Sequence, residues 1–259
     1  MYNIFGEDFM EISIREFYIK TDGRRIFSKL YQPSEQGRLP LVIFSHGLGA
    51  DNMNFEGYAR AVAPLGYACL CFDFCGGGFN SKSSGKTTDM TPLTEVSDLE
   101  AVLNEALQWD FVDAKKVFLV GESLGGLVSA LTAGRNSDLV SGIFLIFPAF
   151  VIRDKARRFK SPDRIPGIIE LPDWITLGRQ YYIDSWNIDV DGAIESFNKP
   201  VRIIHGREDE LVPFESSLSA AGKYADCELR LIDGVGHELN NPVLAEPALS
   251  FLKEFLSEV

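Results

Sequence analysis

Short, continuous apolar runs recur along this chain and constrain its fold more than any other feature. Each run is rich in Val, Ile, Leu or Phe and ends close to a glycine, a proline or a polar residue. The runs lie within residues 39–47, 67–74, 116–123, 141–149 and 199–206. Such runs are typical of strands that are buried on both faces of a parallel sheet.

Helical patterns fill the gaps between these runs. They cover residues 54–66, 91–109, 124–135, 214–224 and 242–259. The second pattern opens with Thr91-Pro92, which fits an N-cap followed by proline at the first helical position. Strands that alternate with helices predict an α/β fold with a doubly wound, mostly parallel sheet. Residues 228–234 add a further strand.

Two segments depart from this alternation. Residues 11–21 and 24–33 alternate apolar and polar side chains around Asp22-Gly23, so they predict an antiparallel hairpin at the N-terminal edge of the sheet. Residues 150–198 are too long for a plain loop and contain several Pro, Tyr and Trp residues. We expect them to form a small inserted cap without a strand of its own, within a single domain over residues 1–259.

Charge and composition exclude several classes of partner. The formal net charge is −12, which argues against nucleic acid and anionic membranes and mildly favours neutral small molecules. No apolar run reaches 18 residues, and the first residues do not look like a signal peptide. The four cysteines lack metal-ligand spacing, and Cys69 and Cys71 fit a buried strand face. We expect reduced thiols, a cytoplasmic protein, and neither a metal nor another cofactor.

Polar residues that could carry chemistry follow directly after the predicted strands, where ligands bind in such sheets. The segment Gly121-Glu122-Ser123-Leu124-Gly125 matches G-x-S-x-G between a strand and a helix. In that setting the serine stands at the tip of a strained turn and acts as a nucleophile. The other interpretation is an ordinary capping serine.

A catalytic serine needs a base, and the chain has only three histidines. Enzymes with this turn carry the triad in the order Ser, acid, His. His46 precedes the serine, and His205 ends a strand, where a structural hydrogen bond is more usual. His237 follows the last predicted strand in a glycine-containing loop, so we assign it as the base.

The acid and the oxyanion donors should lie on neighbouring strand ends. Residues 205–213 offer Glu208, Asp209 and Glu210, which spacing alone does not separate. Two backbone N–H groups must also face the oxyanion of the tetrahedral intermediate. Leu124 after the nucleophile and Leu48 in the loop H-G-L-G are the predicted donors; a tight turn is the alternative for that loop.

Taken together, these motifs resemble those of the α/β-hydrolase superfamily over residues 12–257. The order HGLG, FDFCGGG, GESLGG, HGREDELVP and GVGH is specific as a set. The resemblance implies that the acid is Asp209, four residues after His205. Within the superfamily the chain is most similar to bacterial cinnamoyl or feruloyl esterases and to the related monoacylglycerol lipases and lysophospholipases.

The resemblance also carries an expectation for the cap, where esterases of this group hold the phenolic ring with a polar residue. Tyr181 matches that position and Tyr182 is a second candidate, although both tyrosines could serve cap packing alone. Three residues depart from the family pattern. Glu122 replaces a common His, Leu124 replaces Gln or Met, and Cys75 replaces a common Arg. These changes spare the triad.

The resulting hypothesis is a serine carboxylester hydrolase that acts on small aromatic esters, because the cap is rich in Tyr and Trp. A monoacylglycerol lipase or lysophospholipase is the first alternative. A proline iminopeptidase would need an acidic cap site for the substrate amine, which Glu170, Asp173 or Asp184 could supply. A non-catalytic binding protein on the same fold is the last alternative. Esterases of this group are often homodimers, and the sequence leaves the oligomeric state open.

Overall fold

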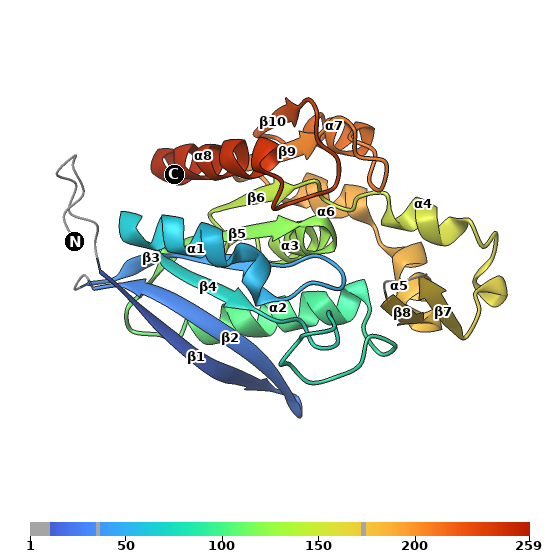
Figure 1. Ribbon diagram of the computed structural model, residues 1–259, viewed down its shortest axis with the longest axis horizontal. Helices are drawn as coiled ribbons and strands as arrows, with labels where there is room; N and C mark the ends of the chain where they lie inside the picture. The colour runs from blue at the N-terminus through green and yellow to red at the C-terminus, as the bar shows by residue number, and fades with distance from the viewer. Residues whose placement is uncertain (1–10, 35–36, 172–174) are drawn as a thin grey trace.

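A central sheet of eight strands organises the computed structural model, which describes residues 11–34, 37–171 and 175–259 (Figure 1). The strand order is β1-β2-β4-β3-β5-β6-β9-β10, and every pair from β4 onward is parallel. This confirms the predicted mostly parallel α/β sheet. The strands are β1 (Ile12–Thr21), β2 (Arg24–Pro33), β3 (Leu39–Ser45), β4 (Ala68–Phe72), β5 (Val112–Glu122), β6 (Gly142–Ile146), β9 (Val201–Gly206) and β10 (Cys227–Ile232).

The N-terminal hairpin forms as predicted. β1 and β2 pair antiparallel in a continuous register from Ile12–Pro33 to Thr21–Arg24. Asp22 and Gly23 make the two-residue turn with φ angles of 42° and 77°. Positive φ at both positions is what a tight hairpin turn needs, and aspartate and glycine tolerate it well.

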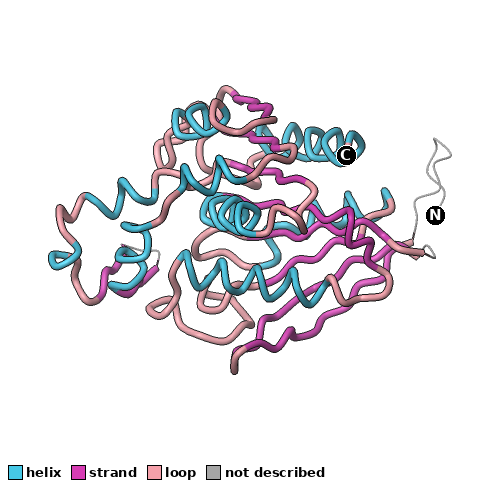
Figure 2. Tube along the Cα trace, turned by 180° about the vertical axis from the view of Figure 1, so that it is seen from behind, coloured by secondary structure: helices cyan, strands magenta, loops and turns pink. Residues whose placement is uncertain are grey.

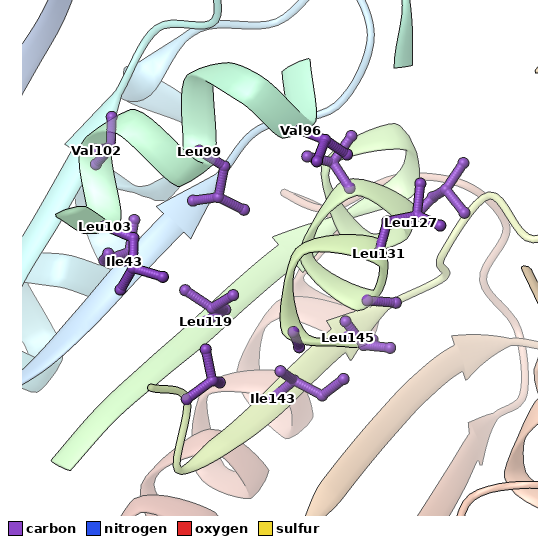
Figure 3. Close-up of a cluster of buried hydrophobic side chains, with 14 of the residues drawn as sticks. Ile43, Val96, Leu99, Val102, Leu103, Leu119, Leu127, Leu131, Ile143 and Leu145 are labelled. Carbon is purple, nitrogen blue, oxygen red and sulfur yellow. The ribbon is translucent and has the colours of Figure 1, made fainter. Parts of the chain in front are cut away.

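Helices cover both faces of the sheet. The helices α1 (Glu56–Val62) and α8 (Pro242–Glu258) pack on one face, and α2 (Pro92–Ala106) and α3 (Ser123–Arg135) pack on the other. Figure 3 shows this second layer, where aliphatic side chains of α2 and α3 meet those of β3, β5 and β6. The remaining body helices are η1 (Asn52–Phe55), η2 (Ala63–Leu65) and α7 (Glu215–Ala221).

The start of α2 illustrates how the sequence sets a helix boundary. Thr91 has extended backbone, and its hydroxyl accepts from the backbone N–H groups of Leu93 and Thr94. The Thr94 hydroxyl in turn accepts from the N–H of Thr91. The predicted Thr-Pro start is therefore a capping box.

The segment between β6 and β9 stands beyond one end of the sheet, at the right in Figure 1 and at the left in Figure 2. Its elements are α4 (Ile152–Arg157), η3 (Pro162–Arg164), β7 (Ile168–Leu171), β8 (Ile175–Gly178), α5 (Arg179–Asn187) and α6 (Val190–Ser196). Our expectation that it contains no strand was wrong, because β7 and β8 form an antiparallel pair. Each of these strands has only four residues, too few for a clear alternating pattern.

No helix in the described ranges is long and apolar enough to cross a membrane. The four cysteines are free; Cys69, Cys71 and Cys75 are buried, and Cys227 is half-buried.

Candidate active site

Ser123 stands at the turn where β5 ends and α3 begins. Its φ angle is 50°, a left-handed backbone conformation that residues other than glycine rarely adopt. The turn is also crowded. A Cβ at Gly121 would lie 2.3 Å from the carbonyl oxygen of Gly125, and one at Gly125 would lie 2.2 Å from the carbonyl oxygen of Ser45. The glycines of the motif thus allow a strained turn that presents the serine.

The structure brings the predicted serine, histidine and aspartate into one chain of contacts. Ser123 Oγ lies 2.8 Å from His237 Nε2, and His237 Nδ1 lies 2.6 Å from Asp209 Oδ2. His237 comes from the loop between β10 and α8, and Asp209 from the loop between β9 and α7. The Phe147 ring packs against the imidazole with its centre 4.3 Å away. These contacts hold the imidazole between the hydroxyl and the carboxylate.

Asp209 is buried and accepts four hydrogen bonds. Its Oδ1 accepts from the backbone N–H groups of Leu211 and Val212, at 3.0 and 2.8 Å. Its Oδ2 faces His237 and also His205 Nε2, at 3.2 Å. Burial opposes ionisation, but hydrogen bonds from His205, His237 and Val212 hold the pKa of Asp209 well below its usual value. The carboxylate therefore stays charged beside His237.

The other two histidines make structural contacts, which was predicted for His205. His205 Nδ1 lies 2.8 Å from the Ser217 hydroxyl, and its Nε2 lies 2.8 Å from the Val212 carbonyl oxygen. His46 Nε2 accepts from the N–H of Phe74, and its Nδ1 therefore carries the proton that it donates to the Gly47 carbonyl oxygen. Neither imidazole reaches Ser123.

The two predicted oxyanion donors lie on adjacent strand ends. β3 and β5 pair so that Ser45 lies opposite Gly121, which places the loop after β3 beside the serine turn. Leu48 and Leu124 both line the same cavity as Ser123. Leu124 is in the first turn of α3, where backbone N–H groups have no carbonyl partner within the helix. This arrangement can supply two N–H groups near the serine hydroxyl.

Glu122 fixes the loop after β3, a contact that sequence reasoning missed. Its side chain is buried, and Oε1 accepts from the N–H of Gly47 at 3.1 Å and from Asn54 Nδ2 at 2.7 Å. Since His46 binds the carbonyl oxygen of Gly47, both polar groups of that residue are held. Burial raises the pKa of Glu122 above its usual value, although these hydrogen bonds oppose the rise. The departure from the family motif at this position was the available signal.

Two cavities share Ser123 in their walls. The first, of about 610 Å³, is lined by His237 and by polar groups that include Glu122, Glu238, Asn54, Asn240 and Asn241. The second, of about 540 Å³, lies under the β6–β9 segment and is lined mainly by apolar side chains. We call them the His237 cavity and the cap-side cavity. Each is large enough for one arm of a small substrate.

Both predicted cap tyrosines reach the cap-side cavity. Tyr181 is buried, Tyr182 is half-buried, and their rings meet edge to face with centres 5.2 Å apart. Tyr182 also packs against Phe159 at 5.2 Å. The tyrosines thus pack in the cap and line the cavity at once.

The carboxylates considered for an amine site lie elsewhere. Asp184 accepts from Gln180 at the surface, Glu170 is exposed, and neither lines the cap-side cavity. Asp173 lies outside the described residues. Within the described ranges, no three His, Cys, Asp or Glu side chains gather as a metal site would require.

Comparison with known proteins places this geometry in a family. A family model described as the alpha/beta hydrolase fold matches residues 40–170, about half of the chain. The chain belongs to this family. The match spans β3 to β7, including the serine turn and the loop after β3.

One solved structure combines high structural similarity with nearly complete coverage. It is Est1E from Butyrivibrio proteoclasticus with ferulic acid bound, which is 29% identical with a TM-score of 0.86. The alignment covers 93% of this chain and 98% of that chain.

Curated relatives match over shorter regions. Human monoglyceride lipase is 28% identical over 150 residues, or 55% of this chain, and the quorum-quenching protein AidA of Acinetobacter baumannii is 29% identical over 116 residues, or 44%. The matches span 46% of the lipase and 37% of AidA, less than half of either relative. Together with the family match and Est1E, the lipase supports an esterase or lipase type of hydrolase.

Proposed function

We propose that the protein is a serine carboxylester hydrolase that acts on small aromatic esters of the cinnamoyl or feruloyl type. One observation carries most weight: Ser123 Oγ, the His237 imidazole and the Asp209 carboxylate form a continuous chain at 2.8 and 2.6 Å. The strained turn at Ser123 and the two cavities that it lines add support.

In this mechanism Ser123 Oγ attacks the ester carbonyl carbon while His237 Nε2 takes the hydroxyl proton. Asp209 keeps the other imidazole proton on Nδ1 and stabilises the imidazolium that forms. The backbone N–H groups of Leu48 and Leu124 bind the oxyanion of the tetrahedral intermediate. His237 then protonates the departing alcohol, and water activated by the same imidazole hydrolyses the acyl-enzyme.

The aromatic preference follows from the lining of the cap-side cavity. Phe159, Tyr181 and Tyr182 offer ring edges and faces to a flat acyl group. The bound ferulic acid in the structural relative Est1E agrees with this choice. A monoacylglycerol lipase is the second candidate, supported by the match to human monoglyceride lipase.

A panel of methyl ferulate, short 4-nitrophenyl esters and monoacylglycerols tests this proposal. Hydrolysis of methyl ferulate with kcat/KM above that for monoacylglycerols is expected, and the reverse ranking would favour the lipase. Ser123→Ala should lower kcat by about 10⁴- to 10⁶-fold and abolish labelling by a fluorophosphonate. Retained turnover in this variant would overturn the assignment of the nucleophile, and cleavage of aminoacyl arylamides without ester cleavage would indicate a peptidase.

A further inference from the structure

The stretch from Arg153 to Arg164 is strongly basic in an acidic protein. It carries six basic and two acidic side chains, whereas the whole chain has a net charge of −12. Within the described part of the chain, none of the six forms a salt bridge. A local concentration of unpaired cations over one cavity attracts negative charge despite the overall field.

Two of these cations line the cap-side cavity. Lys155 and Arg158 belong to its wall together with Ser123, and the other described lining residues are uncharged. Lys155 is half-buried and Arg158 is exposed. Burial and the nearby Arg158 lower the pKa of Lys155, and the Asp209 carboxylate offsets this only in part, so a further negative partner would relieve both effects. The wall is otherwise apolar, apart from the two tyrosines. A ligand that suits this cavity has an apolar body and a negatively charged end.

The His237 cavity has the opposite character. Its ionisable lining residues, apart from the imidazole, are Glu122 and Glu238. An ester with one negatively charged arm therefore has a preferred orientation, because the reversed pose would direct its charge toward two carboxyl groups. We therefore expect the negatively charged arm of the ester to lie in the cap-side cavity.

The position of His237 decides whether the acyl arm or the alcohol arm of the ester occupies the cap-side cavity. The imidazole protonates the leaving alcohol, so the alcohol departs on the side that His237 lines. His237 lines the first cavity and not the cap-side cavity. The acyl arm consequently occupies the cap-side cavity, next to Lys155 and Arg158.

We infer that hemiesters, in which the acyl group ends in a free carboxylate, are better substrates than the neutral esters of matched acyl length, because Lys155 and Arg158 bind that carboxylate. This inference rests on the proposed esterase function and names its acyl specificity. Ser123 Oγ first bonds to the acyl carbon to give the tetrahedral intermediate, which then collapses as the bond to the alcohol oxygen breaks and His237 gives that oxygen its proton. Water then releases a dicarboxylate. Charge-assisted hydrogen bonds from a guanidinium and an ammonium group supply the recognition.

The test compares mono-4-nitrophenyl adipate with 4-nitrophenyl hexanoate, two esters of equal acyl length that differ in the terminal carboxylate. Spontaneous hydrolysis measured without enzyme is subtracted. For the unmodified protein we expect kcat/KM to be about tenfold higher for the adipate ester. The double variant Lys155→Gln/Arg158→Gln should lose this preference through a higher KM for the adipate ester.

Lys160→Gln is the matched control, because Lys160 is exposed in the same basic stretch and does not line the cavity. It should leave the preference unchanged. Equal kcat/KM for the two esters in the unmodified protein would overturn the inference. So would an equal loss of the preference for the adipate ester in Lys160→Gln and in the double variant. Absence of turnover for both esters and for methyl ferulate would instead overturn the esterase function. Calorimetric titration of Ser123→Ala measures binding at the acyl site without catalysis. In this variant monomethyl adipate should bind more tightly than methyl hexanoate.

Discussion

Replacing Asp209 with asparagine should nearly abolish turnover while leaving the fold intact. Asp209 Oδ1 accepts two backbone N–H groups, from Leu211 and Val212. An asparagine keeps its amide oxygen at that position, since only an oxygen can accept both. Its NH₂ group then takes the place of Oδ2, which lies 2.6 Å from His237 Nδ1.

This exchange reverses the tautomer of His237. An NH₂ donor can hydrogen-bond to Nδ1 only when Nδ1 carries no proton, so the imidazole proton moves to Nε2, which faces Ser123 Oγ. A protonated Nε2 cannot accept the serine proton. The loss of kcat expected for a wrong tautomer is about 10⁴-fold, which corresponds to about 5.4 kcal/mol at 1.36 kcal/mol per tenfold. KM should change little, because Asp209 lines neither cavity.

The assay is steady-state hydrolysis of a 4-nitrophenyl ester, with thermal melting followed by circular dichroism. Glu208→Gln is the matched control on the same loop: its carboxylate accepts from the N–H groups of Gly234 and Val235 and does not contact His237. This control should retain kcat within about threefold. If Asp209→Asn kept more than a tenth of the original kcat while remaining folded, the tautomer argument would be refuted.

Three further changes test the support around the site. Glu122→Ala removes the acceptor of the Gly47 N–H and should lower kcat about tenfold. Glu122→Gln keeps an acceptor, so its kcat should stay within about threefold of the unmodified protein. Equal kinetics for the two variants would contradict the role of Glu122 in holding this loop. Gly125→Ala sets a Cβ 2.2 Å from the carbonyl oxygen of Ser45, so it should lower both kcat and Tm, and an unchanged melting curve would contradict the crowding. Burial raises the pKa of Glu95 well above its usual value, so the stability it contributes is present below its unfolded pKa and is lost as pH rises. Glu95→Gln should therefore melt at the same temperature near pH 4 and at a higher temperature near pH 8, each unit of raised pKa being worth about 1.4 kcal/mol; a Tm difference independent of pH would refute this.

Much of the fold was readable from local patterns. Fully buried strands leave continuous apolar runs, the Asp22-Gly23 turn requires positive φ, and Thr91-Pro92 sets a helix start, so each was predicted near its actual position. The short β7–β8 pair was missed. Two strands of four residues have little periodicity, and their pairing is set by what they pack against in the cap.

The residues of the candidate site were also predictable only in part. Chain order singled out Ser123 and His237, because the number of histidines is small and the strand-to-helix motif restricts where a nucleophile can stand. Spacing alone left Glu208, Asp209 and Glu210 equal. In the structure the first and third are exposed, whereas Asp209 is buried against His237.

The sequence by itself determined the layered α/β architecture and the residue types that end each strand, because burial patterns and turn chemistry act over a few neighbouring residues. Only the tertiary structure decided which of those residues meet. Ser123 and His237 are 114 positions apart, and Gly47 and Glu122 are 75 apart, so their contacts depend on strand order and register. The same holds for Lys155 and Arg158, whose place in the wall beside Ser123 depends on how the cap packs at the end of the sheet.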